Sequence, residues 1–177
     1  MIIDIFSDTI CPWCLIGKRR LERAMAQRPD LAFETRWHAF QLNPWMPPEG
    51  MERSAYLTAK FGAKDAASVY DNIRRIGAAD GIDFRFDLIP RTPNTLLSHR
   101  LIGRAAASGR QDAVVEGLFK AYFQEGRDVG SAAELADIAA AAGLDRNETL
   151  AWLASDDGHD AVVAEDAGAR RMGIQGV

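Results

Sequence analysis

The sequence predicts an α/β fold in which a strand–helix–strand unit at the amino end precedes a long block of helices. Two observations support this prediction. Residues 1–45 contain two strand-like runs on either side of one helical pattern, and residues 46–172 are helical almost throughout. The chain has 177 residues, 47% of them hydrophobic and 26% charged, which suits one domain, or one domain that carries a large insertion. The helical block must bury its apolar face, and the strand–helix–strand unit is the available partner.

A strand and a helix come first. Residues 2–6 form a nearly continuous apolar run, which is typical of a strand buried on both faces. The pattern over 12–28 is helical, and Pro29 ends it. Apolar or small residues at helical spacing predict the buried face of this helix, which comprises Cys14, Gly17, Leu21, Ala24 and Met25.

A second strand follows over residues 31–39. Its residues alternate with a period of two, so that Phe33 and Trp37 share one side and Arg36 and His38 share the other. Because strand–helix–strand connections are right-handed, the two strands are expected to run parallel.

The proline-rich segment 43–50 permits neither a helix nor a sheet interior, so it marks the start of the helical block. Helices are predicted over 51–61, 65–79, 94–108, 111–125, 131–142, 145–155 and 158–172, and the run 81–86 is expected to be extended. Ser131 with Glu134, and Asp145 with Glu148, are spaced as helix-capping pairs. The apolar stripe within 114–123 is expected to face the core, with a substrate groove as the alternative.

Charge and hydropathy indicate which partners to expect. The formal charge of −4 and the lack of a long cationic run give no support to nucleic-acid binding, and Lys18, Arg19 and Arg20 are expected to form a solvated helix face. No apolar run approaches the length of a membrane span. The first residues carry no basic segment or cleavage site of a signal peptide, so a cytoplasmic protein without a membrane partner is expected.

The two cysteines of the chain lie in the motif Cys11-Pro12-Trp13-Cys14. A structural disulfide closing so small a loop would constrain little of the unfolded chain. A zinc site would require about four ligands, which three scattered histidines do not complete, so no metal is expected. A Cys-x-x-Cys pair that opens a helix directly after a strand therefore predicts redox chemistry of the thioredoxin type.

The position of each cysteine on the helix predicts its role. Cys11 occupies the N-cap and Pro12 the first helical position, so unpaired N–H groups and the helix dipole lower the pKa of Cys11. Cys11 is thus expected to be the exposed attacking thiol, and Cys14 the more buried thiol that resolves the mixed disulfide. Trp13 is neutral and cannot stabilise a thiolate as a charged residue can, and a nearby Asp8 would raise the thiol pKa. Both effects favour the redox poise of a cytosolic reductant.

The motif Ser7-Asp8-x-x-Cys11-Pro12-Trp13-Cys14-x-x-Gly17 resembles that of DsbA-family oxidoreductases of the FrnE type. This branch also contains 2-hydroxychromene-2-carboxylate isomerase and the kappa-class glutathione transferases. The segments 40–44, 94–101, 118–123 and 173–177 look like further family segments. The resemblance implies a thioredoxin-like fold interrupted by a large all-helical insertion.

The resemblance also divides the chain. It implies an amino-terminal β-α-β part over 1–45, a helical insertion over 46–172, and a return to the thioredoxin-like part over 173–177. Relatives continue from this point with a cis-proline, two strands and a closing helix, so the chain is expected to end before the second half of the sheet. Val177 matches the residue whose backbone contacts substrate.

Within this branch, the first motif position separates two chemistries. The isomerase and the kappa transferases carry a serine that serves glutathione, whereas Cys11 with Cys14 favours dithiol–disulfide exchange on protein or small-molecule thiols. No bound cofactor is expected, and glutathione is a candidate reductant or co-substrate. A glutathione-dependent isomerase or transferase, and a non-catalytic binding module of the same fold, are the alternatives. The sequence leaves a monomer and a homodimer both open.

The remaining candidates each have a plainer interpretation. His99 is either a residue of the groove above the cysteines, counted among the substrate-binding candidates, or a hydrogen-bonded core histidine. Trp45 and Met46 either border a substrate groove or cover the helical layer. His38 is expected to be ordinary, and His159 to belong to a helix-start charge cluster rather than to a metal site.

Overall fold

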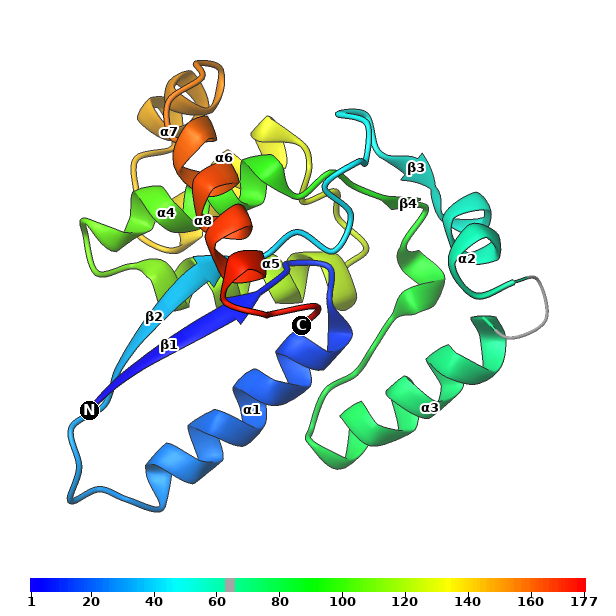
Figure 1. Ribbon diagram of the computed structural model, residues 1–177, viewed down its shortest axis with the longest axis horizontal. Helices are drawn as coiled ribbons and strands as arrows, with labels where there is room; N and C mark the ends of the chain where they lie inside the picture. Colours follow the sequence, from blue (N-terminus) through cyan, green and yellow to red (C-terminus); the bar gives the residue numbers. More distant parts are fainter. Residues whose placement is uncertain (63–65) are drawn as a thin grey trace.

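The structure is a computed structural model that describes residues 1–62 and 66–177. Its first three elements are the strand β1 (Ile2–Ser7), the helix α1 (Pro12–Ala26) and the strand β2 (Glu34–Ala39), as Figure 1 shows. β1 and β2 pair in parallel, from Ile2 opposite Glu34 to Ser7 opposite Ala39. The predicted strand–helix–strand unit is therefore confirmed, although β2 begins later than expected.

The helical block contains seven described helices and two short strands. In chain order its elements are β3 (Met51–Glu52), α2 (Arg53–Phe61), α3 (Ala66–Ala79), the 3-10 turn η1 (Phe86–Leu88), β4 (Arg91–Thr92), α4 (Leu96–Ala106), α5 (Gln111–Phe123), α6 (Ala132–Ala141), α7 (Arg146–Leu153) and α8 (His159–Arg171). All the predicted helices are present, and their described ends lie within two residues of the predicted ones. The predicted start of one helix at residue 65 lies outside the described residues.

The two short strands differ from the expectation. β3 and β4 pair antiparallel, whereas residue 51 was predicted to open a helix. The run 81–86 contains no strand. Its aromatic residues are buried instead, with Phe84 stacked on Phe86 at 4.9 Å and set edge-on to Phe123 at 5.3 Å between ring centroids. Packing between helices, rather than pairing with another strand, holds this segment in place.

One capping prediction is confirmed and the other is wrong. The side chain of Asp145 accepts a hydrogen bond from the backbone N–H of Glu148 at 2.8 Å. Ser131 is the N-cap of α6, but its side chain caps no N–H group. Glu134 instead accepts a hydrogen bond from Arg127 at 2.6 Å, so an ion pair replaces the capping box.

The buried face of α1 is not the predicted one. Leu15, Ile16 and Lys18 are buried, whereas Gly17 and Ala24 are exposed. The helix is turned so that Leu15 and Ile16 join the core of the helical block. The predicted face instead borders a groove of about 300 Å³ along β1.

This rotation also overturns the expected solvated basic face. Lys18 is only 4% exposed. Its Nζ contacts Glu22 on α1 and lies 3.3 Å from both Asp112 and Glu116 on α5. Arg19 pairs with Glu116 as well. Two of the three basic residues therefore fasten α1 to α5.

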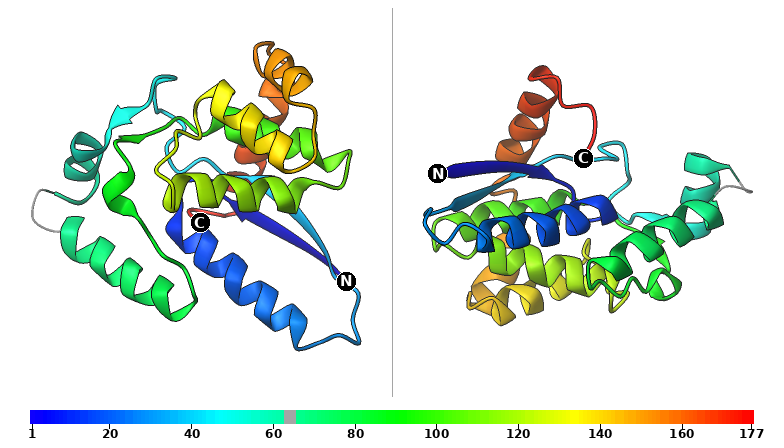
Figure 2. Two further views of the ribbon diagram at one scale, coloured as in Figure 1. Left: turned by 180° about the vertical axis from the view of Figure 1, so that it is seen from behind. Right: turned by 90° about the horizontal axis from the view of Figure 1, so that it is seen from below.

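The helical block packs directly on the strand pair. α8 lies on one side of β1 and β2, while α1, α4 and α5 lie on the other, as the right-hand view of Figure 2 shows. One continuous core joins Ile16 and Trp37 of the first unit to Leu101 and Phe119 of the helices. This confirms the predicted burial partner of the helical block. Among the described helices, none has the length and apolar character that a membrane span requires.

Candidate functional site

Cys11 lies at the junction between β1 and α1. The backbone N–H of Cys11 donates to the carbonyl oxygen of Asp8 at 3.0 Å, and the N–H of Cys14 donates to the carbonyl oxygen of Cys11 at 3.1 Å. Cys11 has the extended backbone of an N-cap residue, and Pro12 opens the helix. This geometry confirms the predicted cap. Proline suits the first helical position because it has no N–H group to leave unpaired.

Both cysteines are free thiols, and their pKa values move apart. The pKa of Cys11 is lowered, chiefly because the Cys14 thiol donates a hydrogen bond that stabilises the Cys11 thiolate. The same hydrogen bond retains the proton of Cys14, and with burial it raises the pKa of Cys14. The negative charge of Asp8 raises the pKa of both thiols. Cys11 therefore ionises first.

The exposure of the two thiols differs from the prediction. Cys11, expected to be exposed, is only 2% exposed, whereas Cys14 is half-buried. The Cys11 thiol donates to the carbonyl oxygen of Val177 at 3.2 Å, so the end of the described chain covers it. Cys11 is therefore buried by contacts with distant parts of the chain, and not by the N-terminus of α1 alone.

Cys11 opens into a cavity of about 210 Å³ that α2 and α3 help to form. Its lining includes Trp13 and Val177, and also Arg53 and Lys60 of α2. Trp13 is itself an exposed aromatic residue. The cavity thus joins the reactive sulfur, an apolar surface and two cationic side chains.

The two cations are held by tyrosines. Arg53 is 8% exposed, and its guanidinium donates to the Tyr122 hydroxyl at 3.3 Å and lies 4.9 Å from the centre of the Tyr70 ring. Lys60 Nζ donates to the Tyr56 hydroxyl at 2.8 Å. Within the part of the chain that the structure describes, neither cation forms an ion pair with a carboxylate. An anionic group that enters the cavity would meet both positive charges.

Several of these cavity residues are not predicted from the sequence. Tyr122 belongs to the apolar stripe that was assigned to the core, and it serves both the core and the cavity. Arg53, Tyr56 and Lys60 lie three and four residues apart on one helix face, a spacing visible in the sequence. That face can be linked to Cys11 only once the packing of α2 is known.

His99 and Asp8 lie together beneath the cysteines. Both side chains are buried. Asp8 Oδ2 accepts the backbone N–H of Leu42 at 2.7 Å, and Asp8 Oδ1 lies 3.3 Å from His99 Nε2. Neither Oδ1 nor Nε2 has a hydrogen-bond partner within the described structure. His99 is thus a buried histidine, as one interpretation held, although its Nε2 makes no hydrogen bond, and it does not line the Cys11 cavity.

Trp45 is not brought to the cysteines. It is 60% exposed and is not part of the lining of the Cys11 cavity, whereas the neighbouring Met46 is buried. A role for Trp45 in substrate binding stays a prediction.

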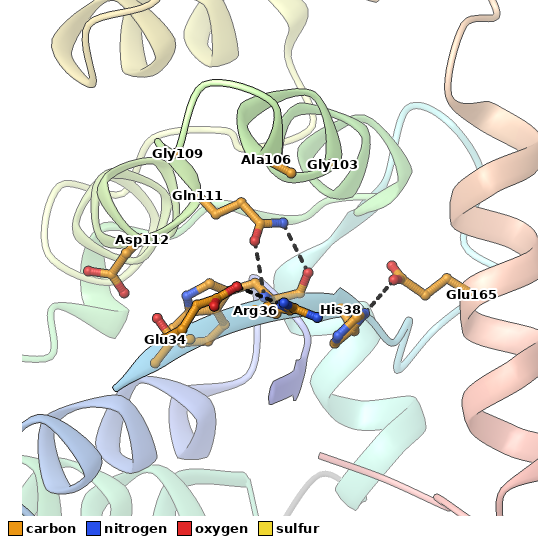
Figure 3. A pocket seen from close by; sticks show the side chains of 11 residues that line it. Glu34, Arg36, His38, Gly103, Ala106, Gly109, Gln111, Asp112 and Glu165 are labelled. Carbon is orange, nitrogen blue, oxygen red and sulfur yellow. Dashed lines mark hydrogen bonds and ion pairs between the residues drawn. The ribbon is translucent and has the colours of Figure 1, made fainter. Parts of the chain in front are cut away.

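A second cavity, of about 580 Å³, lies away from the cysteines along the outer edge of β2. There the Gln111 side chain accepts from the N–H of Trp37 at 3.3 Å and donates to its carbonyl oxygen at 3.1 Å (Figure 3). His38 is held between Glu165 at 2.6 Å and Asp4 at 2.9 Å. These contacts cover the edge of β2, and none of them involves a cysteine. Within residues 1–62 and 66–177, no group of three or more acidic, histidine or cysteine side chains is placed to hold a metal ion.

The family model of the DsbA-like thioredoxin domain matches residues 2–177. The chain belongs to this family. A structure described as a probable DsbA oxidoreductase, SCO1869 from Streptomyces coelicolor, is 33% identical and superposes with a TM-score of 0.89, over 100% of this chain and 78% of that one. The fold is therefore the DsbA-like thioredoxin fold, mostly helical with a small sheet.

More distant relatives of this DsbA-family chain are also known. YwbO from Bacillus subtilis is 25% identical over 146 residues, which span 81% of this chain and 66% of YwbO, somewhat less than two thirds of its length. The cytosolic disulfide reductase DsbM from Pseudomonas aeruginosa (19% identity, 99% and 82% of the two chains, TM-score 0.71) shares the fold, and a second DsbM structure contains glutathione. A 2-hydroxychromene-2-carboxylate isomerase (18%, 100% and 83%, TM-score 0.68) also shares the fold.

Proposed function

We propose that this protein is a thiol–disulfide oxidoreductase of the FrnE type that exchanges electrons through Cys11 and Cys14. The observation that carries the proposal is the opposite movement of the two pKa values, lowered for Cys11 and raised for Cys14. Because the thiolate is the nucleophile in disulfide exchange, Cys11 is the attacking sulfur and Cys14 holds its proton until resolution.

The reaction has two steps. The Cys11 thiolate attacks a substrate disulfide, forming a bond to one substrate sulfur while the other leaves as a thiolate. Cys14 then loses its proton and attacks the Cys11 sulfur, forming the Cys11–Cys14 disulfide and releasing the second substrate sulfur. The substrate gains two electrons and the dithiol loses two. Val177 and Trp13, which flank the Cys11 sulfur, contact the substrate in this proposal.

Glutathione is the proposed reductant that regenerates the dithiol. Two glutathione thiols reduce the Cys11–Cys14 disulfide and leave as glutathione disulfide, so the electrons balance. Support comes from Arg53 and Lys60, whose positive charges lack carboxylate partners in the described structure and face the cavity of Cys11. A peptide thiol that carries carboxylates would supply those partners. With this role we propose a cytoplasmic location. The proposed partners are thiol substrates, rather than nucleic acid or a membrane.

The cationic cavity also keeps a second function open, that of a glutathione-dependent isomerase or transferase. In that case glutathione would bind without forming a disulfide, and the turnover of a small organic substrate would not need Cys14. The two functions therefore make opposite demands on Cys14.

Substitution of each cysteine tests the proposal. Cys11→Ser is expected to abolish the reduction of a model disulfide by glutathione, because the attacking sulfur is gone. Cys14→Ser is expected to stop turnover and to accumulate a mixed disulfide on Cys11, detectable by mass spectrometry of the intact protein. The double variant is the matched control and should form no adduct. Equal activity in the wild type and both single variants would rule out dithiol exchange.

A further inference from the structure

The lining of the Cys11 cavity holds two buried hydroxyl groups that the proposed function does not use. They belong to Thr92 on β4 and Tyr122 on α5, which are 1% and 2% exposed. Thr92 Oγ1 has no hydrogen-bond partner within the described structure. Buried polar atoms are normally paired, and an exception calls for an explanation in function or strain.

The Tyr122 hydroxyl also has a proton to donate. Its oxygen accepts a hydrogen bond from the Arg53 guanidinium at 3.3 Å. Burial raises the pKa of Tyr122 and outweighs the lowering effects of Arg53 and Thr92, so the hydroxyl keeps its proton near neutral pH. Within residues 1–62 and 66–177, no carbonyl or carboxylate oxygen accepts that proton. Tyr122 is therefore a second donor without an acceptor.

The same lining supplies positive charge but no negative charge. Arg53 and Lys60 are its cationic residues, and no aspartate or glutamate is among the described residues that line the cavity. Arg53 is 8% exposed and lies 4.9 Å from the centre of the Tyr70 ring, so its charge is held in place and shielded from water. A negatively charged acceptor would satisfy the guanidinium and both hydroxyl groups together.

We propose that Thr92, Tyr122 and Arg53 form a subsite for a carboxylate group of the substrate. A carboxylate has two oxygens with about four lone pairs, enough to accept from all three residues. The cavity, at about 210 Å³, is smaller than the pockets that hold drug-sized ligands. The substrate class is therefore a small thiol or disulfide whose carboxylate enters the subsite while its sulfur bonds to Cys11. This inference rests on the proposed function, because it requires disulfide exchange at Cys11.

Simple mercapto acids can probe the subsite during reduction of the Cys11–Cys14 disulfide. The sulfur of one thiol bonds to Cys11, and the Cys14 sulfur leaves with the electron pair and takes up a proton. A second thiol then attacks the bound sulfur, which releases Cys11 and forms the small-molecule disulfide. The subsite should accelerate the first step, because it holds the carboxylate while the sulfur meets Cys11. The probes are mercaptoacetate, 3-mercaptopropionate and 6-mercaptohexanoate, each paired with the amide of the same length.

Thr92→Val removes one donor and keeps the shape of the side chain. At the chain length that the wild type favours, the rate ratio of acid to amide should fall about ten-fold or more, because a hydrogen bond to a charged group is lost. Comparing this ratio with the wild-type ratio cancels the intrinsic reactivities of the two thiols. The free energy of unfolding should not fall, because the hydroxyl has no partner in the protein to lose. A merely structural role for Thr92 would give the opposite pattern.

Tyr122→Phe is the second variant and covers the case in which Thr92→Val does not fold. It should lower the same ratio, again because one donor to the carboxylate is lost. Thr149→Val is the matched control. Thr149 is fully buried and its Oγ1 also lacks a hydrogen-bond partner in the described structure, but it does not line the Cys11 cavity. This variant should leave the ratio unchanged.

The measurement is the rate at which free Cys11 and Cys14 thiols appear in oxidised protein after mixing with excess thiol, by quenched alkylation and mass spectrometry. Ratios in Thr92→Val and Tyr122→Phe that equal the wild-type ratio at all three chain lengths would overturn the subsite. If neither acids nor amides reduce the wild-type disulfide, the proposed function itself fails. The two failures are therefore distinguishable.

Discussion

The Cys11 sulfur combines a lowered pKa with almost complete burial. The lowered pKa has local causes, because the hydrogen bonds come from Cys14 and from the backbone of the first turn. The burial has a distant cause, since Val177 and the helices α2 and α3 close the surroundings of the sulfur. The cavity that Arg53 and Lys60 line borders this sulfur.

Removing the cavity cations should weaken the use of glutathione selectively. Lys60→Met and Arg53→Gln are each expected to raise the KM for glutathione about ten-fold, because a hydrogen bond to a charged group contributes about 1.5–3 kcal/mol. The rate with dithiothreitol, an uncharged reductant, should change little.

Steady-state kinetics with the two reductants checks this expectation. Arg75→Gln is the control, because Arg75 lies exposed on α3 and bonds to Asn72. An equal loss with glutathione and with dithiothreitol would mean that the cations do not recognise the carboxylates of the reductant.

Among the helices, α1 and α3 are positioned by packing against neighbouring elements rather than by the periodicity of their own apolar residues. The face of α1 predicted to be buried borders an open groove, and Lys18 lies under acidic residues of α5 instead. α3 packs closely on the segment that follows it, because Gly77 leaves room for the ring of Phe84. Helical periodicity alone does not identify which neighbour each face meets.

Gly77→Ala should destabilise the protein even though alanine is the better helix former. A Cβ at residue 77 would overlap the Phe84 ring, so we expect the free energy of unfolding to fall by about 1–3 kcal/mol. Gly103→Ala is the matched control. No atom lies near the Cβ it would add within α4, so the free energy of unfolding should rise by up to about 1 kcal/mol. Urea unfolding of both variants makes the comparison, and stabilisation by Gly77→Ala would contradict the packing described above.

In the molecule as a whole, His38 links the strand pair to the helical block. It bonds to Asp4 on β1 and to Glu165 on α8, and Glu165 also accepts the N–H of Ala39 at 2.7 Å. Burial lowers the pKa of His38, but hydrogen bonds to Glu165 and Asp4 outweigh it and raise the pKa overall. The division of the chain into parts 1–45, 46–172 and 173–177 stays a proposal, and this link crosses it.

The raised pKa gives the stability of the link a definite pH dependence. A group whose pKa is higher in the folded state stabilises that state fully below its ordinary pKa, about 6.5 for histidine, and loses this effect as the pH rises through the raised value. The loss of unfolding free energy in His38→Gln should therefore be larger near about pH 5.5 than near about pH 8.5.

Urea unfolding at the two pH values measures this difference. His159→Gln is the control, because His159 is exposed and its ring bonds to the neighbouring Asp160. A loss in His38→Gln that does not vary with pH would show that protonated His38 does not hold the link.

The sequence by itself determined the parallel strand–helix–strand unit, the helices that follow it and the place of Cys11 at a helix N-terminus. These features depend on residue periodicity, proline and local spacing, which act over a few neighbouring residues. Only the tertiary structure decided that Cys11 is buried, that Arg53 and Lys60 face it, and that His99 meets Asp8. Those contacts join residues far apart in the chain, and their geometry depends on how the faces of whole helices pack together.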